Sequence, residues 1–235
     1  ADPLGDITYE PEHVKGFEGG VKALLADGDL EVNFDLYSYE YDDLQLNYFN
    51  AATFAYRTLN AEESESKGLE LQLIYLPPSI DGLRLNAAFG YNDSNYVKFV
   101  GPCSGGQKPS EGCNIKDGGL SLQNLNGSKR ALAPEMRANF GFNYNTVLSN
   151  GLEFGLNGNA KHSDEYKLSD TIQDIKQPKY TTFDASVSIS SPEKGWKLAL
   201  IGKNLNDEYI QTSGSDAPST GGGAGTEAGF QGDRY

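Results

Sequence analysis

The chain has 235 residues and a net charge of −14, and 37% of its residues are hydrophobic. This length suits one large domain or two small ones. No position separates two different compositions, so residues 1–235 are predicted to form a single unit. This negative net charge argues against a nucleic-acid-binding protein, which needs a positively charged surface. The 14 Tyr, 11 Phe and 28 Gly favour β-structure over helix.

Eight segments in which apolar and polar residues alternate follow one another along the chain. They cover residues 17–23, 30–37, 69–75, 83–92, 136–144, 152–159, 182–189 and 196–203. A period of two residues places apolar side chains on one face of a strand and polar side chains on the other. Several of these segments keep this character for about 10 residues, which is enough for a tilted strand to cross a bilayer.

The connections between these segments are alternately very short and very long. The short ones are residues 27–28, 77–82, 149–151 and 192–195, and the long ones are residues 43–66, 92–129, 162–179 and 205–235. In an antiparallel sheet every second connection leaves on the same side, so the short turns share one rim and the long loops share the other. Outer-membrane barrels have short periplasmic turns and longer extracellular loops. The rhythm therefore predicts an all-β, antiparallel transmembrane β-barrel.

Alternation by itself leaves open which face is buried, because a soluble β-sandwich hides its apolar face between two sheets. Two features favour the barrel. The polar faces mix Arg, Lys, Glu, Asp, Asn and Gly, which suits a hydrated lumen with paired charges. Aromatic residues also lie near strand ends, where the interfacial girdles of a barrel occur. These aromatic residues are Tyr75, Tyr91, Tyr144, Tyr180 and Trp196.

The two cysteines, Cys103 and Cys113, lie in one long loop. No histidine lies near them to complete a zinc site. A disulfide that pins an exposed loop in an oxidising compartment is the favoured interpretation. Two free thiols are the alternative, because spacing does not prove a bond.

Four local patterns occur in a fixed order along the chain. The first is Tyr9-Glu10-Pro11-Glu12 followed by residues 16–22, and the second is residues 41–45. The third is Asn60-Ala61 followed by Gly68-Leu69-Glu70, and the fourth is Lys203-Asn204-Leu205-Asn206-Asp207-Glu208-Tyr209. Ala133-Pro134, before the fifth predicted strand, fits the same series. Their order and spacing resemble the C-terminal part of the barrel in TonB-dependent outer-membrane receptors.

The resemblance implies a barrel of about 22 strands with a plugged lumen. This chain supplies about eight of those strands, and the plug domain and the closing strand are expected to be absent from it. The resemblance further implies a bacterial outer-membrane location, in contact with outer-membrane lipid and lipopolysaccharide. The implied function is to bind a scarce extracellular nutrient, such as a siderophore, cobalamin or an oligosaccharide, and to import it. The energy would come from the TonB complex acting through the missing plug. The alternatives are a small passive outer-membrane barrel or adhesin, and a soluble β-sandwich that serves as a binding module.

The residues that could carry chemistry are few. No catalytic, cofactor or metal-binding motif is present, so the chain is not expected to be an enzyme. Binding is the better prospect, because loops vary and carry function while strands carry packing. The predicted ligand contacts are Tyr96, Phe99, Lys108 and Lys116 in the loop 92–129, and Tyr166 and Lys167 in the loop 162–179.

Overall fold

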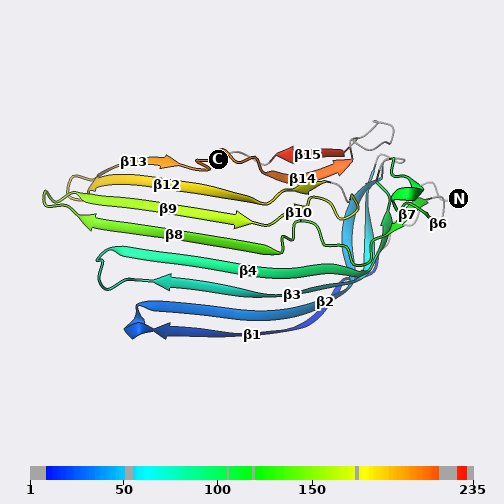
Figure 1. Cartoon of the computed structure of the whole chain (residues 1–235), viewed down its shortest axis with the longest axis horizontal. Helices are drawn as coiled ribbons and strands as arrows, with labels where there is room; N and C mark the ends of the chain where they lie inside the picture. The colour runs from blue at the N-terminus through cyan, green and yellow to red at the C-terminus, as the bar shows by residue number, and fades with distance from the viewer. Residues whose placement is uncertain are drawn as a thin grey trace.

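The computed structural model describes residues 9–50, 55–104, 106–117, 120–172, 175–216 and 227–231. Its main feature is one sheet of eight strands in the order β1-β2-β3-β4-β8-β9-β12-β13, drawn in Figure 1. The strands are β1 (His13–Leu25), β2 (Leu30–Asn50), β3 (Ala55–Tyr75), β4 (Leu83–Lys98), β8 (Met136–Val147), β9 (Glu153–Ser163), β12 (Tyr180–Ser191) and β13 (Trp196–Gly202). Every neighbouring pair is antiparallel. All eight predicted strands are confirmed, in the predicted order.

The four predicted short turns lie together at one end of the sheet, and the long connections lie at the other (Figure 1). The first turn is the short helix η1 (Ala26–Gly28), and the others join β3 to β4, β8 to β9 and β12 to β13. Gly82 shows why such turns need glycine. Its φ is 78°, and a Cβ there would collide with the carbonyl oxygen of Asn145.

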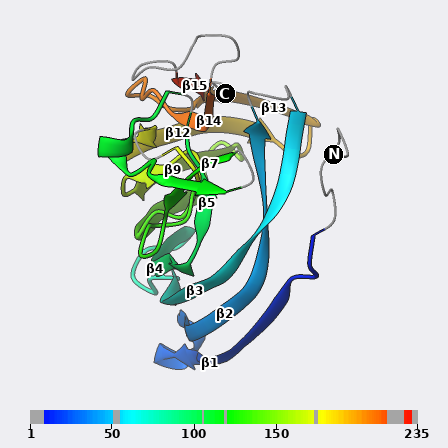
Figure 2. The same ribbon diagram turned by 90° about the vertical axis from the view of Figure 1, so that its right-hand side faces the viewer.

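Strand register places all the apolar faces on one side of the sheet. Across the first five strands, one row runs Val21↔Phe34↔Leu71↔Phe89↔Ala138. The neighbouring row is Gly20↔Asp35↔Glu70↔Gly90↔Arg137, and it lies on the other side of the sheet. The sheet is curved, as Figure 2 shows.

The apolar face is open rather than buried. Leu36, Phe140 and Phe183, on three inner strands of the sheet, are 50%, 53% and 48% exposed. A sandwich would cover these side chains with a second sheet, so that alternative is wrong. Tyr75 and Trp196 are exposed near the short turns, and Tyr91 is exposed nearer the long loops. These positions suit two aromatic girdles on either side of an apolar band.

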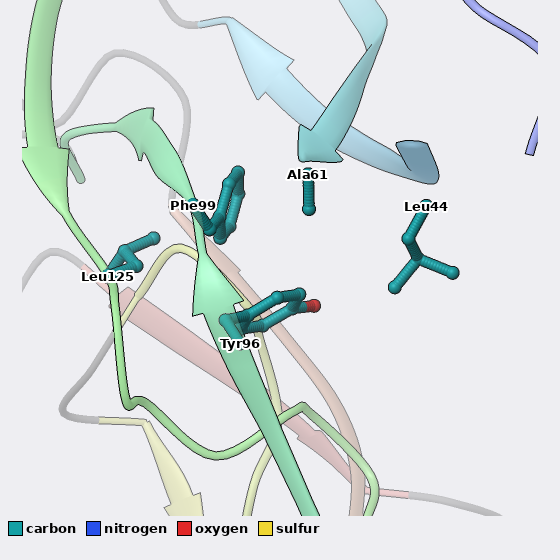
Figure 3. Packing of buried hydrophobic residues seen from close by; sticks show 5 residues of the cluster. All are labelled: Leu44, Ala61, Tyr96, Phe99 and Leu125. Carbon is teal, nitrogen blue, oxygen red and sulfur yellow. The ribbon is translucent and has the colours of Figure 1, made fainter. Parts of the chain in front are cut away.

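The buried hydrophobic residues lie beyond the wall, among the long connections. One cluster contains Leu44, Ala61, Tyr96, Phe99 and Leu125. Figure 3 shows how they converge from β2, β3, the end of β4 and the segment after β7. A second cluster contains Leu168, Ile172 and Ile175.

The connection 43–66 was predicted as a loop, and this prediction is wrong over most of its length. β2 and β3 continue as a paired ribbon through residues 44–50 and 55–66, while residues 51–54 lie outside the described part of the chain. The run of Glu and Ser residues suggested a loop. In a paired ribbon, however, the backbone groups bond across the strands whatever the side chains are, and here Glu62 is exposed while Ser64 and Ser66 are buried.

The other long connections also contain strands that were not predicted. The segment 92–129 continues β4 to Lys98 and then forms a small sheet of β5 (Val100–Pro102), β7 (Leu120–Asn124) and β6 (Ile115–Asp117), with the short helix η2 (Pro109–Glu111). The segment 162–179 contains the hairpin of β10 (Tyr166–Lys167) and β11 (Lys176–Gln177). The segment 205–235 contains the pair β14 (Gln211–Asp216) and β15 (Glu227–Gln231), and its residues 217–226 and 232–235 lie outside the description.

Candidate functional site

The polar face of the sheet carries a hollow of about 880 Å³. Its walls come from β3, β4, β8, β9 and β12 and from the segment that follows β13. The charged side chains that line it are Glu70, Arg137, Lys161, Asp184, Lys203 and Glu208. Lys161 Nζ lies 3.7 Å from Asp184 Oδ2. Mixed charges of this kind suit the water-filled interior of a barrel.

The segment after β13 closes one side of this hollow, and Asn204 holds it in place. The backbone N–H of Asn204 donates to Asp184 Oδ1 at 2.8 Å. Its side-chain amide donates to the carbonyl oxygen of Glu208 and accepts from the N–H of the same residue, both at 2.9 Å. Asn206 Nδ2 donates to the carbonyl oxygen of Thr181 at 2.7 Å. These residues of the late sequence pattern therefore satisfy backbone groups where the strand becomes a loop.

A second, smaller pocket of about 390 Å³ lies between two of the long connections. Its charged lining consists of Lys129, Arg130, Lys167, Lys176, Glu135 and Glu165. Tyr166 also lines this pocket, which we call the loop pocket.

Ion pairs and a ring contact hold three of the four cations of the loop pocket. Lys129 Nζ lies 2.7 Å from Asp93 Oδ1 and 3.4 Å from Glu135 Oε1. Lys176 Nζ lies 2.9 Å from Glu165 Oε1. The guanidinium carbon of Arg130 lies 5.1 Å from the centre of the Tyr41 ring, within the range of a cation–π contact.

Asp170 joins the two connections that form the loop pocket. Its Oδ1 accepts hydrogen bonds from the Tyr96 hydroxyl and from the N–H of Ala131, each at 2.7 Å. Burial, together with the neighbouring Asp170 carboxylate, raises the pKa of Tyr96 well above its usual range, so its hydroxyl stays a donor. Gln123 Nε2 adds a bond of 2.7 Å to the carbonyl oxygen of Thr171. The hairpin β10–β11 is therefore fastened to the segment 92–132.

Burial also perturbs two groups that line the loop pocket. It lowers the pKa of the Lys167 amine to about 8. It also raises the pKa of the Tyr166 phenol to about 12, with the neighbouring Tyr180 as a further cause. Both shifts disfavour the charged form, as desolvation does.

The predicted ligand contacts fall into three groups. Tyr96 and Phe99 are each 1% exposed and pack against one another with ring centres 4.7 Å apart, so they support the loops in this structure. Lys108 and Lys116 are exposed in the segment 103–117, away from the loop pocket. Tyr166 and Lys167 come together in the wall of that pocket. Ligand contact remains a prediction for all six residues.

Three of the four cationic residues that line the pocket were missed from the sequence: Lys129, Arg130 and Lys176. Lys129 and Arg130 lie just before the Ala133-Pro134 step, and Lys176 lies far along the chain. A basic pair ahead of a strand is a weak signal. Their meeting with Lys167 depends on the link through Asp170, which no local pattern shows.

Cys103 and Cys113 form a disulfide in the structure, with Cα atoms 5.7 Å apart. The bond encloses the short helix η2. Gln107 adds hydrogen bonds of 2.8 Å to Gln123 Oε1 and 2.9 Å to the carbonyl oxygen of Glu111. The disulfide therefore fixes the tip of a loop, while the sheet wall does not depend on it.

Two features are absent from the described residues. No group of three or more His, Cys, Asp or Glu side chains there could hold a metal ion. No helix in the described ranges has both the length and the apolar character needed to cross a membrane.

A single curved sheet with an open apolar face, a polar hollow, short turns at one end and long loops at the other is the wall of a bacterial outer-membrane β-barrel. Residues 1–205 match the family model described as TonB dependent receptor-like, beta-barrel, and the chain belongs to this family. It is a family of outer-membrane transport receptors and not of enzymes, as predicted. A comparison with curated protein sequences finds no match.

Solved receptor structures share the fold. The siderophore receptor PiuA of Acinetobacter baumannii is 20% identical with a TM-score of 0.65, over 93% of this chain and 26% of that receptor. The ferric yersiniabactin uptake receptor FyuA of Yersinia pestis is 14% identical with a TM-score of 0.66, over 94% of this chain and 28% of that receptor. The ferric citrate transporter FecA is 17% identical with a TM-score of 0.62, over 94% of this chain and 30% of that transporter. The chain thus spans between a quarter and a third of these receptors.

Proposed function

We propose that this chain forms part of the wall and outer loops of a receptor that imports a scarce nutrient with energy from the TonB complex. The observation that carries the proposal is the family match, combined with a polar hollow on the inner face of the wall. The chain matches only part of each receptor, so the complete receptor would carry out binding and transport, with a plug as the element that couples to TonB.

A ferric siderophore is the cargo that we favour over cobalamin or an oligosaccharide. PiuA is a siderophore receptor, FyuA is an uptake receptor for ferric yersiniabactin, and FecA is a transporter of ferric citrate. Many iron chelates are anionic, and the loop pocket offers four cationic side chains. The support is thus a similarity of fold together with a local charge that would suit such a cargo.

The experiment is an uptake assay with the full-length receptor in a bacterium that lacks its own iron receptors. Ferric chelates labelled with radioactive iron, cobalamin and an oligosaccharide are offered in parallel. We expect uptake of a ferric chelate that disappears when the TonB complex is deleted. Uptake that persists without TonB would contradict the proposal and favour a passive pore.

The order of strands supports a large barrel over a self-closed small one. In a closed barrel of eight strands, β1 would pair with β13, yet these strands occupy opposite edges of the described sheet. Unpaired strand edges do not occur in the hydrocarbon region, because each exposed backbone group costs several kcal/mol there. We therefore expect further strands to continue both edges in the complete receptor.

A further inference from the structure

The loop pocket has a charge that contrasts with the rest of the molecule. The chain as a whole carries −14. The lining of this pocket nevertheless includes four cationic side chains and two carboxylates. The cations come from two connections that are far apart in the sequence, Lys129 and Arg130 from one and Lys167 and Lys176 from the other. Their convergence is a property of the tertiary structure.

Acids and an aromatic ring hold three of these cations in position. Asp93 holds Lys129 from β4, and Glu165 holds Lys176 from within the hairpin segment. Arg130 lies over the ring of Tyr41. A lysine offers three donors and an arginine five, so a single ion pair does not use all of them. Side chains that are already ordered lose less conformational entropy when a ligand binds.

The buried position of Lys167 adds a second argument. Only 8% of this residue is exposed. Burial lowers the pKa of its amine, because an ammonium ion taken out of water costs free energy unless a negative charge accompanies it. Asp170 is the acid that acts on Lys167, and its Oδ1 is also committed to Tyr96 and Ala131. An anion that enters the pocket would supply further negative charge beside the amine.

The size of the pocket fits a small ligand or one group of a larger one. Its volume of about 390 Å³ lies toward the lower end of the range of roughly 300–1,000 Å³ that is usual for small-molecule sites. Phosphate and carboxylate groups are the anions that Arg and Lys bind best through charge-assisted hydrogen bonds.

We propose that the loop pocket is a binding site for a compact anionic group, a phosphate or a carboxylate, held by Arg130, Lys176 and Lys167. The group belongs either to the imported ligand or to the headgroup of an outer-leaflet lipid. The first source rests on the proposed function, and the second does not.

The test uses the full-length receptor and separates the two sources. In one arm, isothermal titration calorimetry measures the binding of citrate and of inorganic phosphate to the receptor in a non-ionic detergent. In the other arm, native mass spectrometry measures how much phosphatidylglycerol the receptor retains from nanodiscs. The variants are Arg130→Gln and Lys176→Gln. Lys98→Gln is the matched control, because Lys98 is an exposed, ion-paired lysine that does not line the pocket.

We expect each pocket variant to weaken anion binding about tenfold in at least one arm, since a hydrogen bond to a charged group contributes at least that factor. Lys98→Gln should leave anion binding unchanged, and Lys176→Arg should retain most of the binding that Lys176→Gln loses. Weakening confined to citrate and phosphate identifies a soluble ligand, and weakening confined to phosphatidylglycerol identifies a lipid.

The inference is overturned if neither arm detects binding, or if Lys98→Gln weakens binding as much as Lys176→Gln. A receptor that imports a ferric chelate without binding any of these probes would refute the anion site and leave the proposed function intact. A receptor that binds the probes without any TonB-dependent uptake would refute the proposed function and leave the anion site intact.

Discussion

The wall and the loops of this molecule place their apolar side chains in opposite ways. In the wall, Leu36 and Phe140 face outward and stay exposed. Above it, Leu44, Tyr96 and Phe99 turn inward and form the best-buried hydrophobic cluster of the described chain. Lipid is the solvent of the first region and water that of the second. One chain therefore needs two opposite arrangements of its apolar residues.

The apolar residues change from one face of the strand to the other within β2. Leu36 and Leu44 are both even-numbered and would share a face in a regular strand. Leu44 instead packs with Tyr41, which belongs to the polar face. Asp43 lies between them with a φ of 56°, and its pairing with β3 is interrupted although the pairs on either side persist. A left-handed residue at this point inverts the alternation while the ribbon continues.

The loop cluster should respond most strongly to a loss of volume. Phe99→Ala should cost about 3–5 kcal/mol of local stability, because it leaves a cavity in a packed site. Limited proteolysis of the full-length receptor should show the segment 92–132 cut faster. The sheet wall should keep its heat-modifiable migration in gels. Val100→Ala, at an exposed neighbour, should change neither, and a wall that melts with Phe99→Ala would refute the independence of the two regions.

The wall should respond most strongly to a charge. Leu71→Arg places a cation on the lipid-facing row and should cost about 2–4 kcal/mol near the bilayer midplane. Gln72→Arg, one residue along and on the polar face, is the matched control and should cost little. The fraction of folded barrel in urea titrations from lipid vesicles measures both. Equal effects of the two variants would contradict the assignment of the faces.

The link between the two long connections should depend on Asp170. Asp170→Ala leaves the Tyr96 hydroxyl and the Ala131 N–H without this acceptor, at about 1–3 kcal/mol for each buried group. Hydrogen exchange should rise in both connections together and remain unchanged in β8 and β9. Asp117→Ala removes an exposed carboxylate from a nearby strand and serves as the control. Exchange that rises in one connection alone would show that Asp170 does not couple them.

The smallest expected effect is a pH dependence of the hairpin β10–β11. The amine of Lys167 has a pKa of about 8 in the folded chain and 10.5 as its reference value. Between these values the opened hairpin binds more protons than the closed one. Its stability should therefore rise from pH 8 to pH 10.5 and be lowest below pH 8. Proteolysis of the hairpin should slow over this range.

Lys167→Met should remove most of that pH dependence, while Lys108→Met, at an exposed site, should preserve it. If the wild-type and Lys167→Met receptors show the same change with pH, another group is responsible.

Much of the wall could be predicted from the sequence, because its signals are local. Alternation with a period of two located all eight strands, and glycine-containing turns located the short connections. The prediction that residues 43–66 form a loop was wrong because it relied on their polar composition. Backbone pairing between β2 and β3 holds the ribbon together through residues 44–50 and 55–61, so a composition like that of a loop is compatible with strands there.

The site was less predictable, because its parts meet through single contacts between distant segments. Tyr166 and Lys167 were identified from their residue types in a long loop, and they do line a pocket. Tyr96 and Phe99 were identified by the same reasoning and proved to be buried. An aromatic residue in a long loop serves equally well as a ligand contact or as local packing.

The sequence by itself determined the class of protein, the eight strands and the rim on which each connection lies, since these depend on period, turn chemistry and connection length. The tertiary structure decided which loop residues are accessible and which cations converge. The carboxylate of Asp170, bonded to Tyr96 74 positions earlier in the chain, sets that arrangement. Contacts of this kind depend on how two separate segments pack against each other, and no neighbouring residues in either segment encode that packing.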